Sequence, residues 1–526
     1  MYKINRKTDL PDIGYMEAKA SQLMKRGIRL ADCNNIKDYY NNLSTQLESD
    51  FALKYGVQNP RSPKQVVEYI KMLASEVELK SKNDIINICY NSETGKWTTD
   101  ANALSKLSDL GYEFAQDLLD YRHAKKYAES ITSIMEAADE NMLIHPEVGL
   151  TKTNRLSYSK PALMSIPKKL LWTLIKPSTD DKQLYSVDIK NQEPHLLISM
   201  TGAKELQYAL EAPEGLYETM FKQCFQPTVT ANVLIDTFME NRRYTPEEIR
   251  TIGTISPALY SSVKPSSTIF LNGKRIISME TVCVGSEKGV YPDLPSTINV
   301  ELEDSSIEAV DVEWNESEIK YKRATDYTVT GKLKNVEIKI TKAERNEFKT
   351  SWLAISYGSG IQNIQEVCKI IDGKRVYKYI TQIEAIKNYR SMISKVASQG
   401  INIIGTTFGT RLYAGIDGSE RSKLKRVLLD LPIQGSGSDI LSLLIMHFDK
   451  YVKENNLENY INIYYTRHDE LILEVDKQWE STVGQAKVEE ILRDIFEHQI
   501  DDWTPFKLEV TRLVSGSINM NVEDDE

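Results

Sequence analysis

Two acidic sites lie far apart in this sequence, and each follows a run of residues that is typical of a β-strand. The first contains Asp188 and the second contains Asp469. Between them, Arg345 and Lys349 stand four residues apart, which would place both on one face of a helix. Carboxylates at strand ends can hold two Mg²⁺ ions, and basic groups one helical turn apart can grip a triphosphate. These residue types, in this order, predict nucleotidyl transfer.

The elements that must position these residues can be read from local signals. Thr341 and Glu344 form a capping-box pattern, so a helix should begin there, and Gly358 should end it. One slowly drifting face of that helix would carry residues at successive four-residue steps, namely Arg345, Lys349, Leu353 and Tyr357. The run 461–474 indicates a hairpin with His468 and Asp469 at its turn. A further helix should contain Arg426, Asp430, Gln434 and Asp439.

The segment 226–340 has a different sequence pattern from the rest of the chain. It alternates strand-like runs with turns, and Asn272-Gly273 between two such runs is a strong hairpin signal. Strands are also expected at 297–302 and 335–340, around an acidic centre at 301–318, and a short helix should open at Thr245-Pro246. On this basis 226–340 is a small β-rich module. By contrast, residues 1–145 should be mostly helical, with a helix start at Ser62-Pro63.

Composition is ordinary for a globular protein of 526 residues, with 41% hydrophobic and 27% charged residues. No apolar run reaches membrane-spanning length, and the five cysteines are scattered without a C-x-x-C pair, which favours a reducing cytoplasm over a zinc site or disulfide frame. The net charge of −10 argues weakly against a nucleic-acid partner. Part of that charge sits in the acidic tail 521–526, and binding depends on local grooves.

Taken in order, these motifs resemble the polymerase module of family A DNA polymerases, the bacterial DNA polymerase I group. Residues 188–193 are similar to the family's motif A, Arg345 to Gly358 to its motif B, and His468-Asp469-Glu470 to its motif C. Thr153 to Ser157 is similar to T-G-R-L-S, and Arg426 to Asp439 is similar to R-x-x-x-N-x-P-x-Q-G-x-x-x-D. No single motif is specific, but their order leaves little room for chance.

The resemblance implies a role for each residue. Asp188 and Asp469 would bridge two Mg²⁺ ions, for which Mn²⁺ could substitute, with the backbone of Ile189 and Glu470 as further ligand candidates. Lys349 would protonate the leaving group and, with Arg345, hold the dNTP phosphates. Glu193 would exclude the ribose 2′-hydroxyl. The remaining contacts would be Tyr357 and Leu353 to the nucleotide, Arg155, Arg426 and Gln434 to primer–template DNA, and His468 to the primer-terminal phosphate.

At three places the sequence departs from the family pattern, and each departure affects an expected contact with nucleotide or DNA. Leu353 replaces the aromatic residue that touches the sugar 3′ side, so the handling of chain terminators is open. Asp430 replaces an asparagine and adds negative charge near DNA. The stretch 161–167 lacks the three amide side chains of P-N-L-Q-N-I-P, which should weaken minor-groove reading.

The expected fold is an α+β right-hand polymerase. Its parts would be a thumb-like region at 1–145, palm at 146–225 with motif A, the β-rich insertion at 226–340 in the fingers, fingers at 341–415 with motif B, and palm at 416–520 with motif C. A proofreading domain would need about 150–200 more residues upstream, so none is expected. The insertion, acidic and exposed, should dock a replication protein or restrain the DNA path sterically, and the alternative is a surface elaboration with no partner.

Two other functions stay open from the sequence alone. A single-subunit RNA polymerase shares a similar core, although Glu193 would crowd a ribose 2′-hydroxyl. A catalytically inactive DNA-binding homologue is disfavoured by the retained aspartates and basic residues. The expected partners are primer–template DNA and dNTPs without a membrane, in the cytoplasm of a bacterium or a phage-infected cell.

Overall fold

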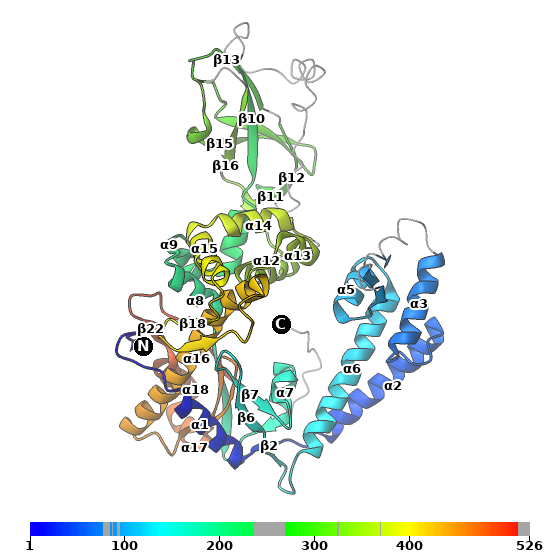
Figure 1. Ribbon diagram of the computed structural model, residues 1–526, viewed down its shortest axis with the longest axis vertical. Helices are drawn as coiled ribbons and strands as arrows, with labels where there is room; N and C mark the ends of the chain where they lie inside the picture. Colours follow the sequence, from blue (N-terminus) through cyan, green and yellow to red (C-terminus); the bar gives the residue numbers. More distant parts are fainter. Residues whose placement is uncertain are drawn as a thin grey trace. The chain divides into compact units, whose positions relative to one another are not determined.

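The computed structural model describes residues 1–76, 85–86, 88–91, 95–235, 269–280, 282–322, 326–368 and 370–513 (Figure 1). The predicted helix start at Thr245 and the acidic tail at 521–526 lie outside these residues. The chain mixes α and β structure and divides into two compact units. The first comprises 1–196, 403–415 and 431–526, and the second comprises 197–402 and 416–430.

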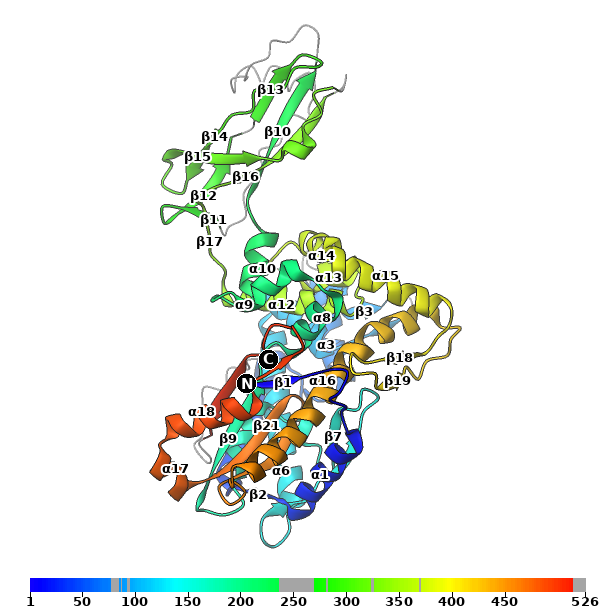
Figure 2. The ribbon, with the colours of Figure 1, turned by 90° about the vertical axis from the view of Figure 1, so that its left-hand side faces the viewer.

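An antiparallel sheet of four strands forms the centre of the first unit (Figure 2), with the strand order β20-β21-β9-β23. Its strands are β9 (Lys182–Ile189), β20 (Ile461–Arg467), β21 (Glu470–Asp476) and β23 (Leu508–Arg512). Nearly every residue of β20 and β21 is buried, so both faces of this part of the sheet are covered and the strands read as continuous apolar runs. The predicted hairpin at 461–474 is confirmed, with Arg467 opposite Glu470 across the turn.

The first 30 residues join this body, although the sequence suggested a thumb-like region from residue 1. Strand β1 (Tyr2–Ile4) pairs in parallel with β22 (His498–Ile500), and the Asp12 backbone exchanges hydrogen bonds with the Ser442 hydroxyl. Nearby elements are α1 (Ile13–Arg26), β2 (Ile28–Leu30), β5 (Leu143–Ile144), β6 (Glu147–Leu150), β7 (Leu156–Ser159), α7 (Lys168–Leu174), β8 (Ile175–Lys176), β18 (Ile403–Gly405), β19 (Arg411–Tyr413), α17 (Lys477–Val483) and α18 (Gln485–Phe496).

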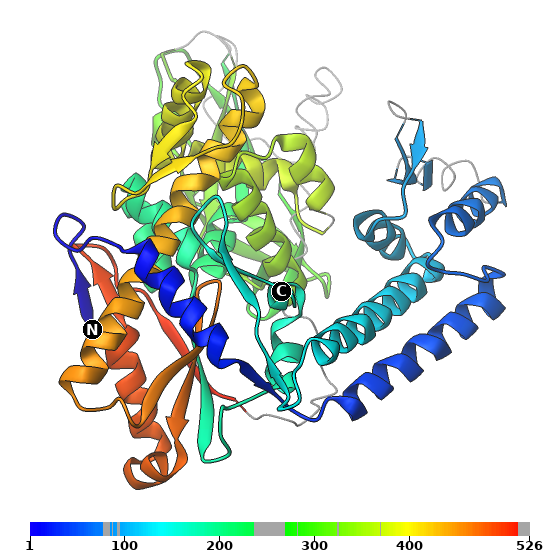
Figure 3. The same cartoon turned by 60° about the horizontal axis from the view of Figure 1, so that its bottom comes forward.

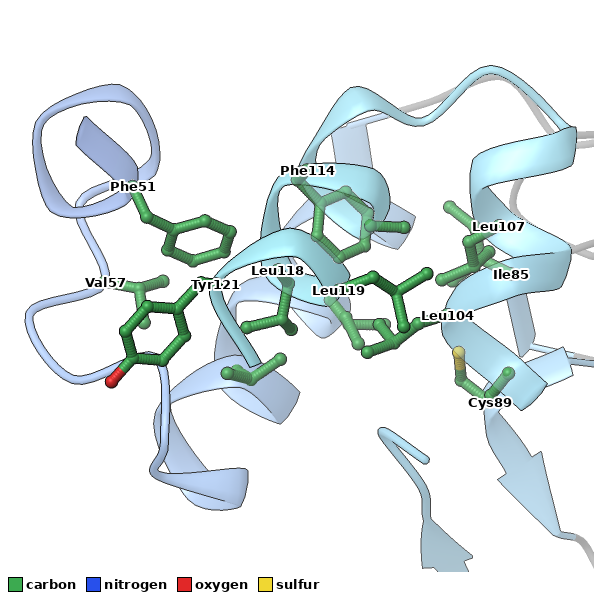
Figure 4. Packing of buried hydrophobic residues seen from close by; sticks show 14 of the residues in the cluster. Phe51, Val57, Ile85, Cys89, Leu104, Leu107, Phe114, Leu118, Leu119 and Tyr121 are labelled. Carbon is green, nitrogen blue, oxygen red and sulfur yellow. The ribbon is translucent and has the colours of Figure 1, made fainter. Parts of the chain in front are cut away.

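Residues 34–136 form a helical arm with a hydrophobic core of its own. Helix α2 (Asn34–Tyr55) runs alongside α6 (Glu113–Glu136), as Figures 1 and 3 both show. Helices α3 (Pro63–Glu76) and α5 (Ala101–Asp109) and the hairpin β3 (Tyr90–Asn91) and β4 (Lys96–Trp97) complete it. The Ser62 hydroxyl accepts from the Gln65 amide, which confirms the predicted helix start. Phe51, Phe114 and Leu118 meet in the core between the helices (Figure 4).

In the second unit, the described residues form mainly helices and a β-module. The helices are α9 (Lys204–Glu211), α10 (Leu216–Cys224), α12 (Lys342–Ser356), α13 (Ile361–Val367), α14 (Gly373–Gln382), α15 (Glu384–Ser398) and the first turns of α16 (Arg421–Glu454). The capping box of α12 is confirmed, since Thr341 and Glu344 each accept from the other's backbone amide. Buried Phe348, Trp352 and Ile355 hold one face of α12 against the other helices.

The β-module lies between α10 and α12. Its described strands form one eight-stranded sheet in the order β13-β10-β16-β15-β14-β12-β11-β17, around a shared core. They are β10 (Thr228–Ile235), β11 (Ile269–Leu271), β12 (Lys274–Met279), β13 (Val282–Ser286), β14 (Thr297–Leu302), β15 (Ile307–Trp314), β16 (Tyr327–Leu333) and β17 (Glu337–Ile338). The Asn272-Gly273 hairpin and the strand at 297–302 are confirmed. The strand expected at 335–340 covers only Glu337–Ile338.

No helix in the described part of the chain is both long enough and apolar enough to cross a bilayer.

The buried core of the arm gives a stability prediction. Leu118→Ala should lower the free energy of unfolding by about 2–5 kcal/mol, because it removes buried methyl groups and leaves a cavity. Leu53→Ala on α2 is the matched control, since Leu53 is 87% exposed. Urea denaturation followed by circular dichroism compares the two. Equal effects of both substitutions would contradict this packing.

Candidate active site

The acidic end of β9 sets the position of Asp188. The strand pairs with β21 on one side and β23 on the other, which fixes its register. After Ile189 the chain turns through Asn191, whose φ of 53° lies in the left-handed region that asparagine tolerates. Helix α8 (Gln192–Thr201) then begins, so Asp188 stands at the junction of a strand and a helix with its side chain 30% exposed. A residue in this setting can reach solvent without disturbing the sheet.

The tight turn between β20 and β21 presents Asp469 beside this junction. His468 takes a φ of 53° at the turn, and Glu470 pairs directly with Asp188 across the sheet. Burial, and next the negative charge of Asp188, raises the pKa of Asp469 to about 6. The structure therefore brings the two aspartates close enough for their charges to interact.

Glu470 has partners of its own. Its carboxylate accepts from the buried Ser186 hydroxyl, and the Lys168 ammonium lies 3.3 Å from the same Oε1 atom. The Lys168 Nζ also donates to Oδ2 of Asp188 at 2.8 Å. Ser186, Asp188 and Glu470 share one face of the sheet, because Ser186 and Asp188 are two residues apart on β9 and Glu470 lies opposite Asp188. This lysine is thus the cation that contacts both Asp188 and Glu470.

These residues fit a divalent cation. Carboxylate oxygens are the ligands that Mg²⁺ prefers, and the raised pKa of Asp469 shows that its charge lacks full compensation. Among the described residues, no group of three or more histidine, cysteine, aspartate or glutamate side chains forms a ready-made metal cage. The donors present are therefore two aspartates, which suits a metal that keeps waters or shares substrate phosphates.

Arg155 and Glu193, both predicted as site residues, form an ion pair with each other. Arg155 follows the β6–β7 turn, and its Nη2 lies 2.5 Å from Oε1 of Glu193 in the first turn of α8. Both side chains are about one-fifth exposed, at 23% and 22%. Burial, and then the charges of Arg467 and Arg155, lowers the pKa of His468. The structure therefore brings Arg155, Glu193 and His468 into one charged group.

The remaining predicted residues lie mostly in the second unit. Arg345 is exposed on α12 over the ring of Tyr217, with 5.7 Å from the guanidinium carbon to the ring centroid. Half-buried Lys349, Leu353 and Tyr357 continue the same helix. Arg426 is exposed on α16, whereas half-buried Gln434 follows on the same helix in the first unit.

Gly358 explains how the end of α12 can pack on α16. Its φ is 95°, and a Cβ there would lie 2.7 Å from the Leu429 side chain and 3.6 Å from Arg426. A side chain at this position would be both strained and crowded. The Arg390 guanidinium donates to the carbonyl of Ile355, which satisfies part of the helix end.

Sequence reasoning missed three residues of the acidic cluster and its supports. Lys168 directly follows the stretch 161–167, which departs from the family pattern. Ser186 lies two residues before Asp188, and Arg467 lies just before the β20–β21 turn. Arg467 is buried and donates to the Ile166 carbonyl at 2.7 Å, which ties the turn to that stretch. The alternation of side chains along a strand could have placed Ser186 on the face of Asp188. No sequence signal pointed to Lys168.

Comparison with known proteins identifies the family. The sequence model of DNA polymerase family A matches residues 31–235 and 325–523, which is more than half of the chain. The chain therefore belongs to DNA polymerase family A. Residues 279–339, in the β-module, match a separate model, the bacterial Ig-like domain of group 4.

Two bacterial DNA polymerases I are similar to short stretches of this chain. DNA polymerase I of Rhizobium leguminosarum is 29% identical over 130 residues, which are 23% of this chain and 13% of that protein. DNA polymerase I of Aquifex aeolicus (strain VF5) is 23% identical over 162 residues, which are 29% of this chain and 26% of that protein. The matched stretches thus span about a quarter or less of these relatives.

The fold is similar to that of a solved polymerase domain. The POL domain of Pol1 from M. smegmatis, in complex with DNA primer-template and dNTP, superposes with a TM-score of 0.62 at 16% identity. The alignment covers 96% of this chain and 70% of that domain. At this identity the likeness establishes the fold.

Two buried histidines in the first unit give a prediction about the pH dependence of stability. His195 on α8 and His498 on β22 stack on Phe506, with ring centroids 3.8 Å and 4.5 Å away. Neither Nε2 atom has a hydrogen-bond partner among the described residues. Burial lowers the pKa of each imidazole to about 4.

Because the unfolded chain takes up these protons first, the free energy of unfolding should fall as pH drops from 6.5 towards 4, by on the order of 1–3 kcal/mol. Urea denaturation at several pH values measures this slope. His195→Gln combined with His498→Gln should flatten it, whereas His123→Gln at an exposed position should not. An unchanged slope in the double variant would assign the pH dependence to other groups.

Proposed function

We propose that this chain carries out template-directed, primer-dependent DNA synthesis from dNTPs by two-metal nucleotidyl transfer, within a right-hand arrangement of palm, fingers and thumb. The observation that carries the proposal is the pairing of Asp188 with the Asp469 turn at adjacent strand ends. Membership of DNA polymerase family A supports it. The sheet of the first unit corresponds to the palm, the arm at 34–136 to the thumb, and α12 with its neighbours to the fingers.

Asp188 and Asp469 would hold the metal ions, with the Ile189 carbonyl as a further ligand. When bound, the ions would lower the pKa of the primer 3′-hydroxyl and neutralise charge on the triphosphate. Glu470 contacts Ser186 and Lys168, so we assign it to the support of Asp188 and not to the metal. The contacts support this division, since Glu470 is 3% exposed and already has two partners, whereas Asp188 is 30% exposed.

Residues of α12 would bind the incoming nucleotide. Arg345 would pair with the outer phosphate, and Lys349 would hold a proton at Nζ for the departing pyrophosphate. Tyr357, at the end of the helix, would stack beside the new base pair, and Leu353 would contact the sugar. Arg155, Arg426 and Gln434 would bind primer–template sugars and phosphates, with His468 at the primer-terminal phosphate.

Substitution of the aspartates tests the metal assignment. Asp188→Ala and Asp469→Ala should each lower the rate of primer extension by several orders of magnitude, because each removes a metal ligand. Asp181→Ala, in the exposed turn before β9, is the control and should retain the parent rate. Single-turnover extension with Mg²⁺ measures all three. Near-parent rates in both active-site variants would refute the assignment.

Lys349 can be tested on its own helix. Lys349→Ala should slow the chemical step and weaken dNTP binding, since it removes a phosphate contact and a proton donor. Lys342→Ala, at the exposed start of α12, is the control. An unchanged single-turnover rate for Lys349→Ala would remove it from the mechanism.

Glu193 should exclude ribonucleotides. Glu193→Ala should raise the incorporation of NTPs relative to dNTPs, because the 2′-hydroxyl gains room. The ratio of single-nucleotide incorporation rates for dCTP and CTP measures discrimination in the parent and the variant. Equal ratios would assign discrimination elsewhere. A parent that prefers NTPs would favour the RNA polymerase alternative, and a parent inactive with both would favour the inactive homologue.

We also propose that the chain does not edit a mismatched 3′ end and that the β-module docks a replication protein. Outside the residues that match the polymerase family, the described chain is mainly this module, which resembles an Ig-like domain. Arg375 of α14 donates to the carbonyls of Cys224 and Gln226, at 2.8 Å each, and so holds the segment between α10 and β10 to α14.

Deletion of 228–338 with a short linker tests the module's role. The deletion begins at β10, because that strand pairs with β13 and β16 and would otherwise lose its partners. Single-nucleotide incorporation on short primers should persist, whereas processivity or protein binding should change. A folded deletion variant that incorporates no nucleotide would show that the module belongs to the catalytic core.

A further inference from the structure

Lys168 occupies an unusual position at the start of α7. It follows Pro167, which ends the preceding extended stretch, and it is the first residue of the helix. One turn later Trp172 lies beneath its ammonium, with 4.9 Å from Nζ to the ring centroid. The proline, the helix start and the indole ring together restrict where this long side chain can reach.

The same ammonium connects two carboxylates of different kinds. It lies 2.8 Å from Oδ2 of Asp188, whose side chain is 30% exposed, and 3.3 Å from Oε1 of Glu470, whose side chain is 3% exposed. Glu470 also accepts from Ser186, so its buried charge is compensated on two sides. Glu470 and Trp172 thus fix the lysine in place, and Asp188 is the partner that remains accessible to another cation.

We propose that Lys168 is the resident counter-cation of this carboxylate site, held against Asp188 by Glu470 and Trp172, and that a divalent ion binds Asp188 in competition with it. The inference rests on the proposed function in that Asp188 is taken to be a metal ligand. Lys168 acts as a positioning residue: it compensates the carboxylate repulsion in the metal-free protein and raises the concentration of metal at which the site fills.

Charge and distance decide the direction of this effect. A unit positive charge a few ångströms from a ligand carboxylate repels an incoming cation, and the repulsion is strong where water is partly excluded. Removal of the ammonium should therefore tighten metal binding, even though it leaves Glu470 with one fewer partner. A lysine with only a structural role would give the opposite result, because its loss would loosen Asp188 and weaken binding.

The experiment measures Mn²⁺ binding to the full chain by electron paramagnetic resonance, without DNA or nucleotide. Lys168→Met should lower the dissociation constant for Mn²⁺ by on the order of tenfold. Lys168→Arg keeps the charge and should stay near the parent value. Lys160→Met is the matched control, because Lys160 pairs with Glu147 at 3.0 Å in an exposed ion pair. Asp188→Asn should abolish the competing site.

Each outcome has a clear meaning. A dissociation constant for Lys168→Met equal to or weaker than the parent value overturns the counter-cation role while leaving the proposed function intact. Absence of saturable Mn²⁺ binding in both the parent and Lys168→Met also overturns the counter-cation role, whereas primer extension by the aspartate variants tests the proposed function separately. Should Lys168→Met not fold, as judged by circular dichroism, Lys168→Gln gives the same comparison with a polar side chain. Greater thermal stabilisation by Mn²⁺ in the neutral variant than in the parent supplies a second, independent readout.

Discussion

The concentration of negative charge at the end of one sheet is the constraint on which the rest of this structure depends. Asp188, Asp469 and Glu470 gather where β9 meets the β20–β21 turn. Burial of a carboxylate and like charges at short range are both costly, and they raise the pKa of Asp469, burial first and the charge of Asp188 second. The fold must therefore impose the arrangement, and it does so with strands whose apolar side chains are buried on both faces. Lys168 and Ser186 then supply the local compensation.

The predicted site residues are distributed over the two units. The carboxylates belong to the first unit, whereas the basic face of α12 belongs to the second. Helix α16 contributes to both, and the division falls between Asp430 and Leu431, next to Pro432 within the helix. Proline removes a backbone donor from the helical ladder, so this long helix, although continuous, lacks one backbone hydrogen bond near the point where the units divide. The residues proposed to bind the nucleotide and those proposed to bind metal thus belong mostly to different units.

Local chemistry made much of this fold predictable. The Thr341–Glu344 capping box, the Ser62-Pro63 helix start and the Asn272-Gly273 hairpin each depend on a few adjacent residues, and each is confirmed. The strands β10, β13, β15 and β16 were not predicted one by one, and β10 pairs with β13 and β16, which lie far from it in sequence. Tertiary pairing likewise moved the first 30 residues from the expected thumb to the sheet-bearing body.

In the candidate site, too, residues with a local sequence signal were predicted and residues brought together only by the fold were not. Asp188 and Asp469 stood out because each follows a strand-like run, and the structure brings their strands together. Lys168 was not found, since an isolated lysine after a proline carries no signal until its distance to Asp188 is known. The buried stack of His195, Phe506 and His498 was missed for the same reason, as its members come from separate elements.

The most direct test of the central claim is a crystal structure of the chain with primer–template DNA, a dNTP and Mn²⁺, with data collected at the manganese absorption edge. The account predicts anomalous peaks within about 2.0–2.3 Å of carboxylate oxygens of both Asp188 and Asp469, the distance range of first-row metals and oxygen ligands. A nucleotide bound to the DNA with no manganese at either aspartate would contradict it.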